Sequence, residues 1–250
     1  RQPRSTLFPY TTLFRSLRYW GVVPAAGVGR RMGGAVPKQY LSVNGRLVIE
    51  HALGRLLHHP LIERVYVALS REDRWWDENC YAGHARIVPV EGGTERSHSV
   101  LNALCRISEE ADPEDWVLVH DAARPCLRAA DIDRLLQALA DDPVGGILAG
   151  RLADTVKLEE QPGVVAETLP RDRLWRAFTP QMFRFNLLQE SLGAALQAGR
   201  SVTDEASAIE MRGLKPRLVE GHADNIKITH PRDLELAGFY LQQQNCGVVE

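Results

Sequence analysis

Short apolar runs alternate with amphipathic stretches along this chain. The nearly continuous apolar runs predict buried strands at residues 19–25, 65–69, 86–90, 116–119 and 144–149. The amphipathic stretches predict helices that begin at Val48, that carry Val100, Leu104 and Ile107 on one side, and that span 131–140 and 186–198. Strands with few polar positions, separated by helices, indicate an α/β fold: a mostly parallel sheet with helices on both faces.

One segment breaks this alternation. Within residues 151–174, two strand-like runs at 151–158 and 164–169 flank a Gln-Pro-Gly turn, which predicts a β-hairpin rather than a crossover helix. A hairpin of this length is too short to be a domain, so we interpret it as an arm that lies across the body or reaches a second subunit. We therefore expect a single domain over residues 19–243 and a short tail at 244–250.

The first residues do not fit this pattern. Residues 6–16 read TLFPYTTLFRS, which resembles one reading frame of a common sequencing adapter. We therefore expect residues 1–16 to be foreign to the natural protein and a disordered leader to extend to residue 18. A natural flexible extension is the alternative.

Composition narrows the function classes. The chain has 250 residues, 44% of them hydrophobic and 25% charged, and a formal net charge of −2. With this near-neutral net charge, the protein has no overall positive potential that would bind a nucleic-acid backbone. No apolar run approaches the roughly 18 residues that a membrane span needs. The four cysteines are widely separated, so we expect reduced thiols in a cytoplasmic protein rather than a disulfide framework or a structural zinc site.

A glycine- and arginine-rich segment follows the first predicted strand. Residues 24–32 read PAAGVGRRM, and Lys38 follows shortly after. Glycines let the backbone approach a phosphate chain closely, and Arg31 and Lys38 supply charge that could balance a triphosphate. The pattern is not the dinucleotide fingerprint, because Met32 occupies the position of its third glycine. Taken alone, it leaves phosphate binding and a plain strand–turn–helix joint equally open.

Two aspartates lie near predicted strand ends. Asp121 follows the strand at 116–119, where open α/β sheets bind ligands, and carboxylate oxygen suits Mg²⁺. Asp224 and Lys227 lie three positions apart near another strand end. The alternatives are that Asp121 caps the following turn and that Asp224 and Lys227 form a solvated surface pair.

Together these segments resemble the 2-C-methyl-D-erythritol 4-phosphate cytidylyltransferase family of the non-mevalonate isoprenoid pathway. The resemblance runs from about Trp20 to Leu241 and is carried in order by PAAGVGRRM, PKQY, EGGTERSHSV, VLVHDAARP, ADT, TPQ, TDEA and DNIK. It implies a nucleotide-binding sheet and an arm that forms a homodimer. It also implies a reaction in which CTP and methylerythritol phosphate give the diphosphocytidyl product and pyrophosphate, with Mg²⁺.

The resemblance further implies roles for individual residues. The catalytic residues would be Arg31, Lys38 and Lys227. The nucleotide would contact Ala25, Ala26, Gly27, Gly29, Gly93, Thr94, Ser99 and Asp121. The substrate phosphate site would involve Arg124, Thr155, Arg171, Thr179 and Thr203, with Thr155 and Arg171 reaching the other subunit. The metal would be held by Asp121 and Asp224.

Two alternative functions remain. A ribitol-5-phosphate cytidylyltransferase shares most nucleotide motifs, although Arg171 and Thr203 argue against it. A non-catalytic nucleotide-binding protein on the same fold would be expected to lose Lys38, Asp121 or Lys227, and all are present. One position departs from the family: Thr94 stands where well-known relatives carry an acidic residue, which leaves the base preference open.

Overall fold

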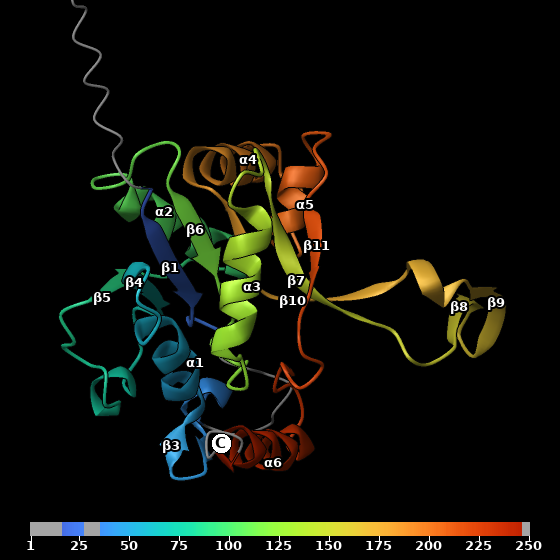
Figure 1. Ribbon diagram of the computed structural model, residues 1–250, viewed down its shortest axis with the longest axis horizontal. Coiled ribbons are helices and arrows are strands. Elements are labelled where there is room, and N and C mark those ends of the chain that lie inside the picture. Colours follow the sequence, from blue (N-terminus) through green and yellow to red (C-terminus); the bar gives the residue numbers. More distant parts are fainter. Residues whose placement is uncertain (1–16, 28–35, 247–250) are drawn as a thin grey trace, which may run out of the picture.

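A computed structural model describes residues 17–27 and 36–246 of the chain (Figure 1). Its central sheet has seven strands in the order β11-β7-β10-β6-β1-β4-β5. These strands are β1 (Tyr19–Pro24), β4 (Ile62–Leu69), β5 (Ile87–Glu91), β6 (Trp116–Val119), β7 (Gly145–Arg151), β10 (Trp175–Arg184) and β11 (Arg217–Glu220). β10 runs antiparallel to β6 and β7, and the other pairs of the sheet are parallel. The predicted mostly parallel sheet is confirmed.

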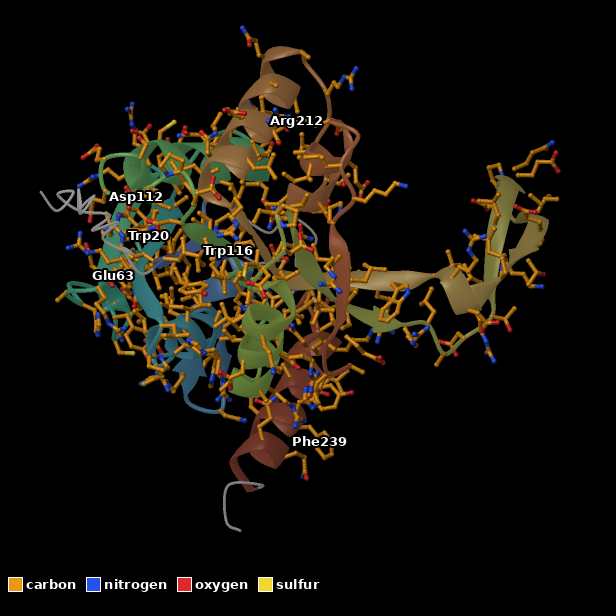
Figure 2. All side chains as sticks on the ribbon, turned by 45° about the horizontal axis from the view of Figure 1, so that its top comes forward. Trp20, Glu63, Asp112, Trp116, Arg212 and Phe239 are labelled. Carbon is orange, nitrogen blue, oxygen red and sulfur yellow. The ribbon has the colours of Figure 1, made fainter. Side chains whose placement is uncertain are left out.

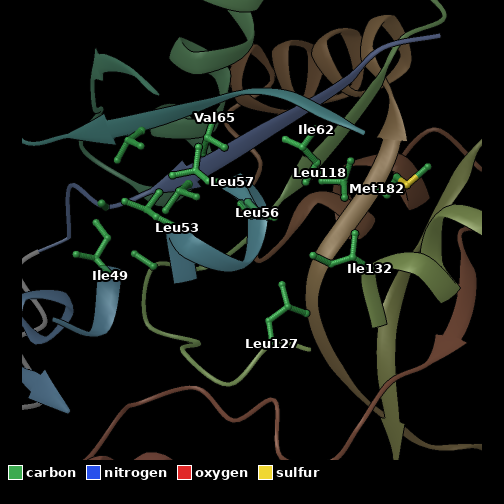
Figure 3. Close-up of a cluster of buried hydrophobic side chains, with 14 of the residues drawn as sticks. Ile49, Leu53, Leu56, Leu57, Ile62, Val65, Leu118, Leu127, Ile132 and Met182 are labelled. Carbon is green, nitrogen blue, oxygen red and sulfur yellow. The ribbon is translucent and has the colours of Figure 1, made fainter. Parts of the chain in front are cut away.

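Helices cover both faces of the sheet, as predicted. α1 (Val48–Leu57) and α3 (Ala129–Leu139) pack on one face, where Leu53 and Ile132 join Leu118 of β6 in one apolar cluster (Figure 3). α2 (Arg96–Ile107), α4 (Phe185–Gln197) and α5 (Glu205–Glu210) pack on the other face. No helix in the described part of the chain has the length and apolar character to span a membrane.

Alternation along each strand divides the core between these faces. In β6, Val117 and Val119 belong to the cluster under α2, α4 and α5, whereas Trp116 and Leu118 belong to the cluster under α1 and α3. All four side chains are completely buried. Because both faces are covered, the strand is apolar at every position, which explains its unbroken run in the sequence. Figure 2 shows Trp116 inside the body and Phe239 at its margin.

The last helix forms a separate, smaller layer. α6 (Arg232–Cys246) packs against the short strand β2 (Ser42–Val43), which pairs with β3 (Arg46–Leu47). Its Ala237 and Leu241 contact Val43 and Cys126 in a third buried cluster. This cluster holds the segment around β2, which comes after β1 in the chain, next to the C-terminal segment that comes after β11.

The predicted hairpin forms and projects from the body (Figure 1). β8 (Val156–Gln161) and β9 (Val164–Leu169) pair antiparallel, and Gly163 makes the turn with a φ of +81°, a conformation that favours glycine. Leu158, Val164 and Val165 are about half exposed on this arm. The hairpin prediction is confirmed, and the apolar side chains on it lack a covering surface within the described chain.

The sequence pattern did not predict strand β10. Its first residues are exposed and its last residues are buried, and Pro180 interrupts the polar and apolar pattern. The pairing with β7 shifts register between Ala177 and Gln181, which accommodates a residue without an N–H donor. Insertion of β10 between β6 and β7 brings Thr179 beside the end of β6.

Candidate active site

A cavity of about 270 Å³ lies at the sheet edge where β1, β5 and β6 end. Parallel strands present their carboxyl ends at one edge, so the loops that follow them converge there. Most residues predicted for the nucleotide, and two predicted for catalysis, line this cavity: Ala25, Ala26, Gly27, Lys38, Gly93, Thr94, Ser99, Asp121 and Lys227. Sequence reasoning did not assign the remaining lining residues: Pro24, Gln39, Glu95, Arg96, Ala122 and Ala123.

The loop after β1 is held by a buried glutamine. Nε2 of Gln39 donates to the carbonyl oxygens of Ala25, at 2.7 Å, and Gly27, at 3.1 Å. The Ala25 N–H also donates to the carbonyl oxygen of Ala68 in β4 at 2.8 Å. These bonds fix the start of the loop against the sheet. The predicted residues Gly29 and Arg31 lie outside the described residues.

The loop after β5 depends on two glycines. A Cβ at Gly92 would lie 2.4 Å from the Cβ of Ala26, and one at Gly93 would lie 2.3 Å from the Cβ of His98. The Gly93 N–H donates to Oγ of Ser99 at 3.0 Å, and that hydroxyl lies 3.1 Å from the carbonyl oxygen of Glu95. Side chains at positions 92 and 93 would therefore push this loop away from α2 and from the loop after β1.

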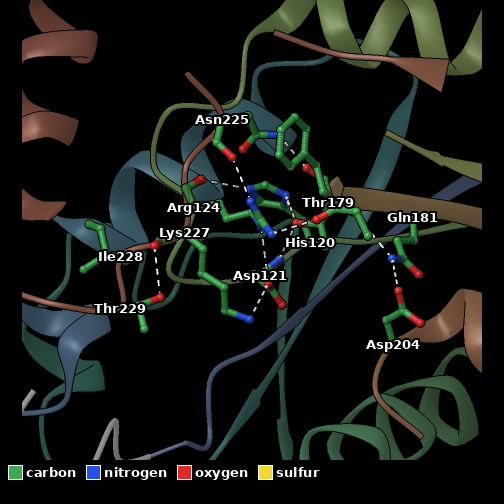
Figure 4. A network of polar contacts seen from close by, with 12 residues as sticks. His120, Asp121, Arg124, Thr179, Gln181, Asp204, Asn225, Lys227, Ile228 and Thr229 are labelled. Atoms are coloured by element: carbon green, nitrogen blue, oxygen red, sulfur yellow. Dashed lines mark hydrogen bonds and ion pairs between the residues drawn. The ribbon is translucent and has the colours of Figure 1, made fainter. Parts of the chain in front are cut away.

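Asp121 stands at the end of β6 among cationic side chains (Figure 4). Its Oδ2 lies 2.8 Å from Nζ of Lys227 and 3.4 Å from Nε of Arg124, and its Oδ1 lies 2.9 Å from Nε of Arg96. Burial by itself would raise the pKa of the Asp121 carboxyl. Arg96, Lys227 and Arg124 outweigh this effect and hold that pKa far below its ordinary value. Asp121 is therefore ionised at neutral pH and orients the cations of the cavity wall.

A buried glutamate supports this cluster from behind. Nη1 and Nη2 of Arg96 lie 2.6 Å and 3.0 Å from the two carboxylate oxygens of Glu205, which is completely buried. Burial lowers the pKa of Arg96, but the carboxylates of Glu205 and Asp121 more than reverse this and raise it above its ordinary value. The pairing spans 109 positions of sequence. Glu205 belongs to the TDEA motif, but no local pattern in the sequence links it to Arg96.

The N-terminus of α5, which carries Glu205, is held by two polar side chains. Asp204 precedes the helix and caps it, since its Oδ1 accepts from the Ser207 N–H at 2.9 Å. Gln181 of β10 donates to Oδ2 of Asp204 at 2.9 Å and accepts from the Ala206 N–H at 2.9 Å (Figure 4). The buried carboxylate of Glu205 is thus tied to the central sheet.

Thr179 is joined to the end of β6 through His120. Nε2 of His120 lies 3.0 Å from the carbonyl oxygen of Arg124, and since a carbonyl only accepts, Nε2 carries the proton. Nδ1 then accepts from the Thr179 hydroxyl at 2.9 Å, and that hydroxyl accepts from the Asp121 N–H at 3.1 Å. Burial lowers the pKa of His120 to about 4, so the imidazole is neutral at pH 7. This chain of bonds fixes Thr179 next to Asp121 (Figure 4).

Arg124 and Asp224 lie behind the cavity wall and do not line it. Nη1 of Arg124 donates to the carbonyl oxygen of Asn225 at 2.7 Å. Oδ2 of Asp224 accepts from Nη2 of Arg128 at 2.6 Å and from Nε2 of Gln244 at 3.2 Å. Oδ1 of Asp224 is buried and has no hydrogen-bond partner among the described residues.

The Asp121 carboxylate fits a divalent metal that takes most of its ligands from phosphate and water. Asp121 places a hard oxygen donor on the cavity wall, and Mg²⁺ in nucleotide sites often binds one or two carboxylates plus substrate phosphates. Among residues 17–27 and 36–246, no group of three or more His, Cys, Asp or Glu side chains could hold an ion unaided. The metal role of Asp121 is therefore compatible with the geometry, and that of Asp224 remains a prediction.

Two lysines reach the cavity from opposite ends of the chain. Lys38 begins the short helix η2 (Lys38–Tyr40), and its Nζ donates to the carbonyl oxygen of Ile228 at 2.8 Å. Lys227 precedes Ile228 and pairs with Asp121. Both lysines line the cavity, so a polyphosphate bound there could contact both ammonium groups.

The remaining predicted substrate residues lie away from the cavity. Thr155 and Arg171 belong to the arm, and Arg171 donates to the carbonyl oxygen of Ala153 at the arm's base. Thr203 is exposed ahead of α5. Because the arm projects away from the body (Figure 1), Thr155 and Arg171 do not join the cavity of their own chain.

Comparison with known proteins identifies the relatives of this chain. Residues 20–243 match the family described as IspD: 2-C-methyl-D-erythritol 4-phosphate cytidylyltransferase. A protein of that name from Hahella chejuensis is 53% identical over 226 residues, which cover 90% of this chain and 94% of the relative. A protein of the same name from Pseudomonas fluorescens is 52% identical over 218 residues, which cover 87% of this chain and 93% of the relative.

Solved structures agree with these relatives. A crystal structure of 4-diphosphocytidyl-2C-methyl-D-erythritol synthase superposes with a TM-score of 0.78 at 34% identity, over 91% of this chain and 99% of that one. The cytidylyltransferase from Francisella tularensis superposes with a TM-score of 0.76 at 38% identity, over 89% of this chain and 99% of that one. The likeness therefore extends over most of this chain and nearly all of each of the two solved chains.

Proposed function

Because the chain belongs to the 2-C-methyl-D-erythritol 4-phosphate cytidylyltransferase family, we propose that the cavity at the ends of β1, β5 and β6 is its active site. The enzyme transfers CMP from CTP to 2-C-methyl-D-erythritol 4-phosphate in isoprenoid precursor biosynthesis. The products are 4-diphosphocytidyl-2-C-methyl-D-erythritol and pyrophosphate. The observation that supports the location is the convergence of Lys38, Asp121 and Lys227 on one cavity.

In this proposal the two glycine-containing loops hold the nucleotide. Ala25, Ala26 and Gly27 approach it from the end of β1, where Gln39 fixes the backbone. On the other side, the loop that contains Gly93 and Thr94 faces the cytosine and its ribose, together with Ser99. Small side chains and backbone N–H groups suit this task, since they let the ligand approach the main chain closely.

The phosphate of the substrate acts as the nucleophile without a general base. The second pKa of a phosphate monoester is about 6, so an oxygen is already anionic at neutral pH. That oxygen forms a bond to the α-phosphorus of CTP while the bond to the leaving phosphate oxygen breaks, and pyrophosphate departs with the electron pair. Arg31, Lys38 and Lys227 neutralise the charge that gathers on the phosphoryl oxygens.

The family depends on a divalent metal, and we propose Mg²⁺ with Asp121 as its protein ligand and Asp224 in support. When bound, the ion neutralises phosphate charge and orients the triphosphate. The protein's own contribution is to hold Asp121 in place, and Arg96 and Lys227 do this through its two oxygens.

We also propose that the arm completes the substrate site of a second copy in a homodimer. Thr155 and Arg171 lie on an arm that projects from the body, while Arg124, Thr179 and Thr203 belong to the body. The half-exposed side chains of Val164 and Val165 give the arm an apolar surface suited to such an interface. A cytoplasmic location, expected from the widely spaced cysteines, stays a prediction.

Pyrophosphate release from CTP and Mg²⁺ tests the proposed function, with methylerythritol phosphate and ribitol 5-phosphate supplied separately. Release with the first substrate only is the expected result, and release with ribitol 5-phosphate only would reassign the reaction. CTP binding without release on either substrate would indicate a nucleotide-binding protein instead. Replacing CTP by UTP then measures the base preference that the threonine at position 94 leaves open.

A variant of Lys38 tests the location of the site. We expect Lys38→Ala to lower kcat by about a hundredfold, because it removes a cation that faces the developing charge. Lys215→Ala is the matched control, since Lys215 is exposed and does not line the cavity. If Lys38→Ala raised only the KM for CTP and left kcat intact, the role in the transition state would be wrong.

A further inference from the structure

A second cavity, of about 260 Å³, is lined by residues of the β2–β3 hairpin, α1 and α6, elements that lie close together in Figure 1. It is lined by Asn44, Arg46, Glu50, His51, Gly54, Arg55, His58 and Leu241. It shares no lining residue with the active-site cavity. Its occupant therefore need not take part in cytidylyl transfer.

Basic side chains dominate the wall of this cavity. His51 and Arg55 are four positions apart on α1 and lie on one face of the helix, and His58, which caps the C-terminal end of α1, follows three positions later. Arg46 reaches the same space from β3. Each arginine carries a full positive charge at neutral pH. Two guanidinium groups face a single carboxylate in this wall, which leaves a net positive charge, so the cavity suits an anion.

The arginines have only neutral hydrogen-bond partners. Arg46 donates to the hydroxyl of Tyr81 at 3.2 Å and lies 3.7 Å from Sγ of Cys80. Arg55 donates to the side-chain oxygen of Gln244 at 2.9 Å. In the described ranges neither guanidinium forms an ion pair with a carboxylate, and each has N–H groups left for a further acceptor.

Glu50, the one acidic side chain among the lining residues, already accepts hydrogen bonds from the backbone. The carboxylate oxygens of Glu50 accept from the Leu47 N–H at 2.9 Å and from the Cys80 N–H at 2.7 Å. Burial would raise the pKa of Glu50, but these backbone hydrogen bonds outweigh it and lower that pKa. Glu50 therefore anchors the start of α1 and balances only part of the charge of the two arginines.

The positive charge of the cavity also affects the pKa of His51. Burial is the main cause that lowers the pKa of His51, and the neighbouring Arg46 and Arg55 lower it further, against the opposing effects of Val43 and Glu50. A dianion placed among these groups would offset this repulsion. It would also accept hydrogen bonds from both guanidinium groups.

We propose that this cavity binds a small phosphorylated anion, either inorganic phosphate or the phosphate monoester of a small metabolite. A doubly charged oxyanion matches two fixed guanidinium charges and two histidines better than a single carboxylate does. The site does not depend on the proposed function, because it lies outside the active-site cavity.

The test follows the imidazole C–H resonances of His51 and His58 by NMR in the full chain. Potassium phosphate is titrated in, and potassium chloride at equal ionic strength separates binding from screening. We expect saturable shifts of both resonances with phosphate and not with chloride. The double variant Arg46→Gln and Arg55→Gln is expected to bind at least about tenfold more weakly, since it removes both charge-assisted donors.

Controls keep the outcome decisive. Arg71→Gln removes an exposed arginine elsewhere and should leave the phosphate affinity unchanged. Arg55→Lys keeps the charge but loses the planar fork, so about a threefold weaker affinity is expected even if the double variant fails to fold. Non-saturating shifts, or full phosphate affinity in both the double variant and Arg55→Lys, would overturn the proposal.

Two further experiments separate this proposal from the proposed function and identify the source of the phosphate. Tighter binding of glycerol 3-phosphate than of inorganic phosphate would support an organic phosphate ester, and the reverse order would support free phosphate. Pyrophosphate release from CTP is measured on the same variants, and kcat/KM should stay within about twofold of the parent, as for substitutions away from an active site. An inactive parent that still binds phosphate would reject the proposed function alone.

Discussion

Replacing Asp121 by Asn removes the one charge that meets three cations at the end of β6. Loss of one partner from a buried ion pair costs about 3–5 kcal/mol, because the remaining charges stay buried without compensation. Here the lower end applies. The side chain of Lys227 is 37% exposed and can turn toward water, and Arg96 keeps its pairing with Glu205. We therefore expect Asp121→Asn to lower the free energy of unfolding by about 3 kcal/mol at pH 6.

The pH dependence of the difference in unfolding free energy between the parent protein and Asp121→Asn provides a second, independent test. The folded-state pKa of Asp121 is depressed, so its ionisation stabilises the fold above the unfolded value of 3.8, and this contribution is lost as pH falls below it. At pH 3 the unfolded carboxyl is mostly protonated while the folded one is still ionised, which removes about 1.2 kcal/mol. The stability gap between the two proteins should shrink by that amount from pH 6 to pH 3.

Urea unfolding at fixed protein concentration, followed by far-UV circular dichroism at both pH values, measures these quantities. Asp141→Asn is the matched control: Asp141 is exposed, and its replacement should change stability by less than about 0.5 kcal/mol. A loss below about 1 kcal/mol at pH 6 would refute the view that Asp121 compensates the cation cluster. A gap that does not depend on pH would refute the depressed pKa.

Further predictions concern the support of the site and the arm. Glu205→Gln should lower the free energy of unfolding by about 3 kcal/mol in urea titrations, since it removes one partner of a buried ion pair, whereas the exposed Glu210→Gln should change it by less than about 0.5 kcal/mol. Thr179→Val should cost about 1–3 kcal/mol in the same assay, because it leaves Nδ1 of His120 buried without a donor. Val165→Lys on the arm should shift the protein from dimer to monomer in sedimentation velocity while leaving its far-UV circular dichroism spectrum unchanged. An unchanged dimer would contradict the proposed role of the arm.

Local patterns in the sequence were sufficient to predict most of the fold. The apolar runs at residues 65–69 and 116–119 became central strands because a strand covered on both faces must be apolar at every position. The periodic residues from Val48 became α1, since one helical face packs on the sheet. The polar hairpin around Gly163 became the arm. In each case neighbours within a few positions carry the physical signal.

Only the tertiary structure decided how the cavity wall is held together. Glu205 pairs with Arg96 across 109 positions, and Thr179 meets His120 across 59. The second contact requires β10 to lie beside β6, and the first requires α5 to pack next to α2. No local periodicity encodes which strands or helices become neighbours. The sequence alone could show that Asp121 ends a strand. The set of cations around it is a property of chain segments that meet only when the sheet has formed, because ion pairs and buried hydrogen bonds depend on spatial rather than sequential distance.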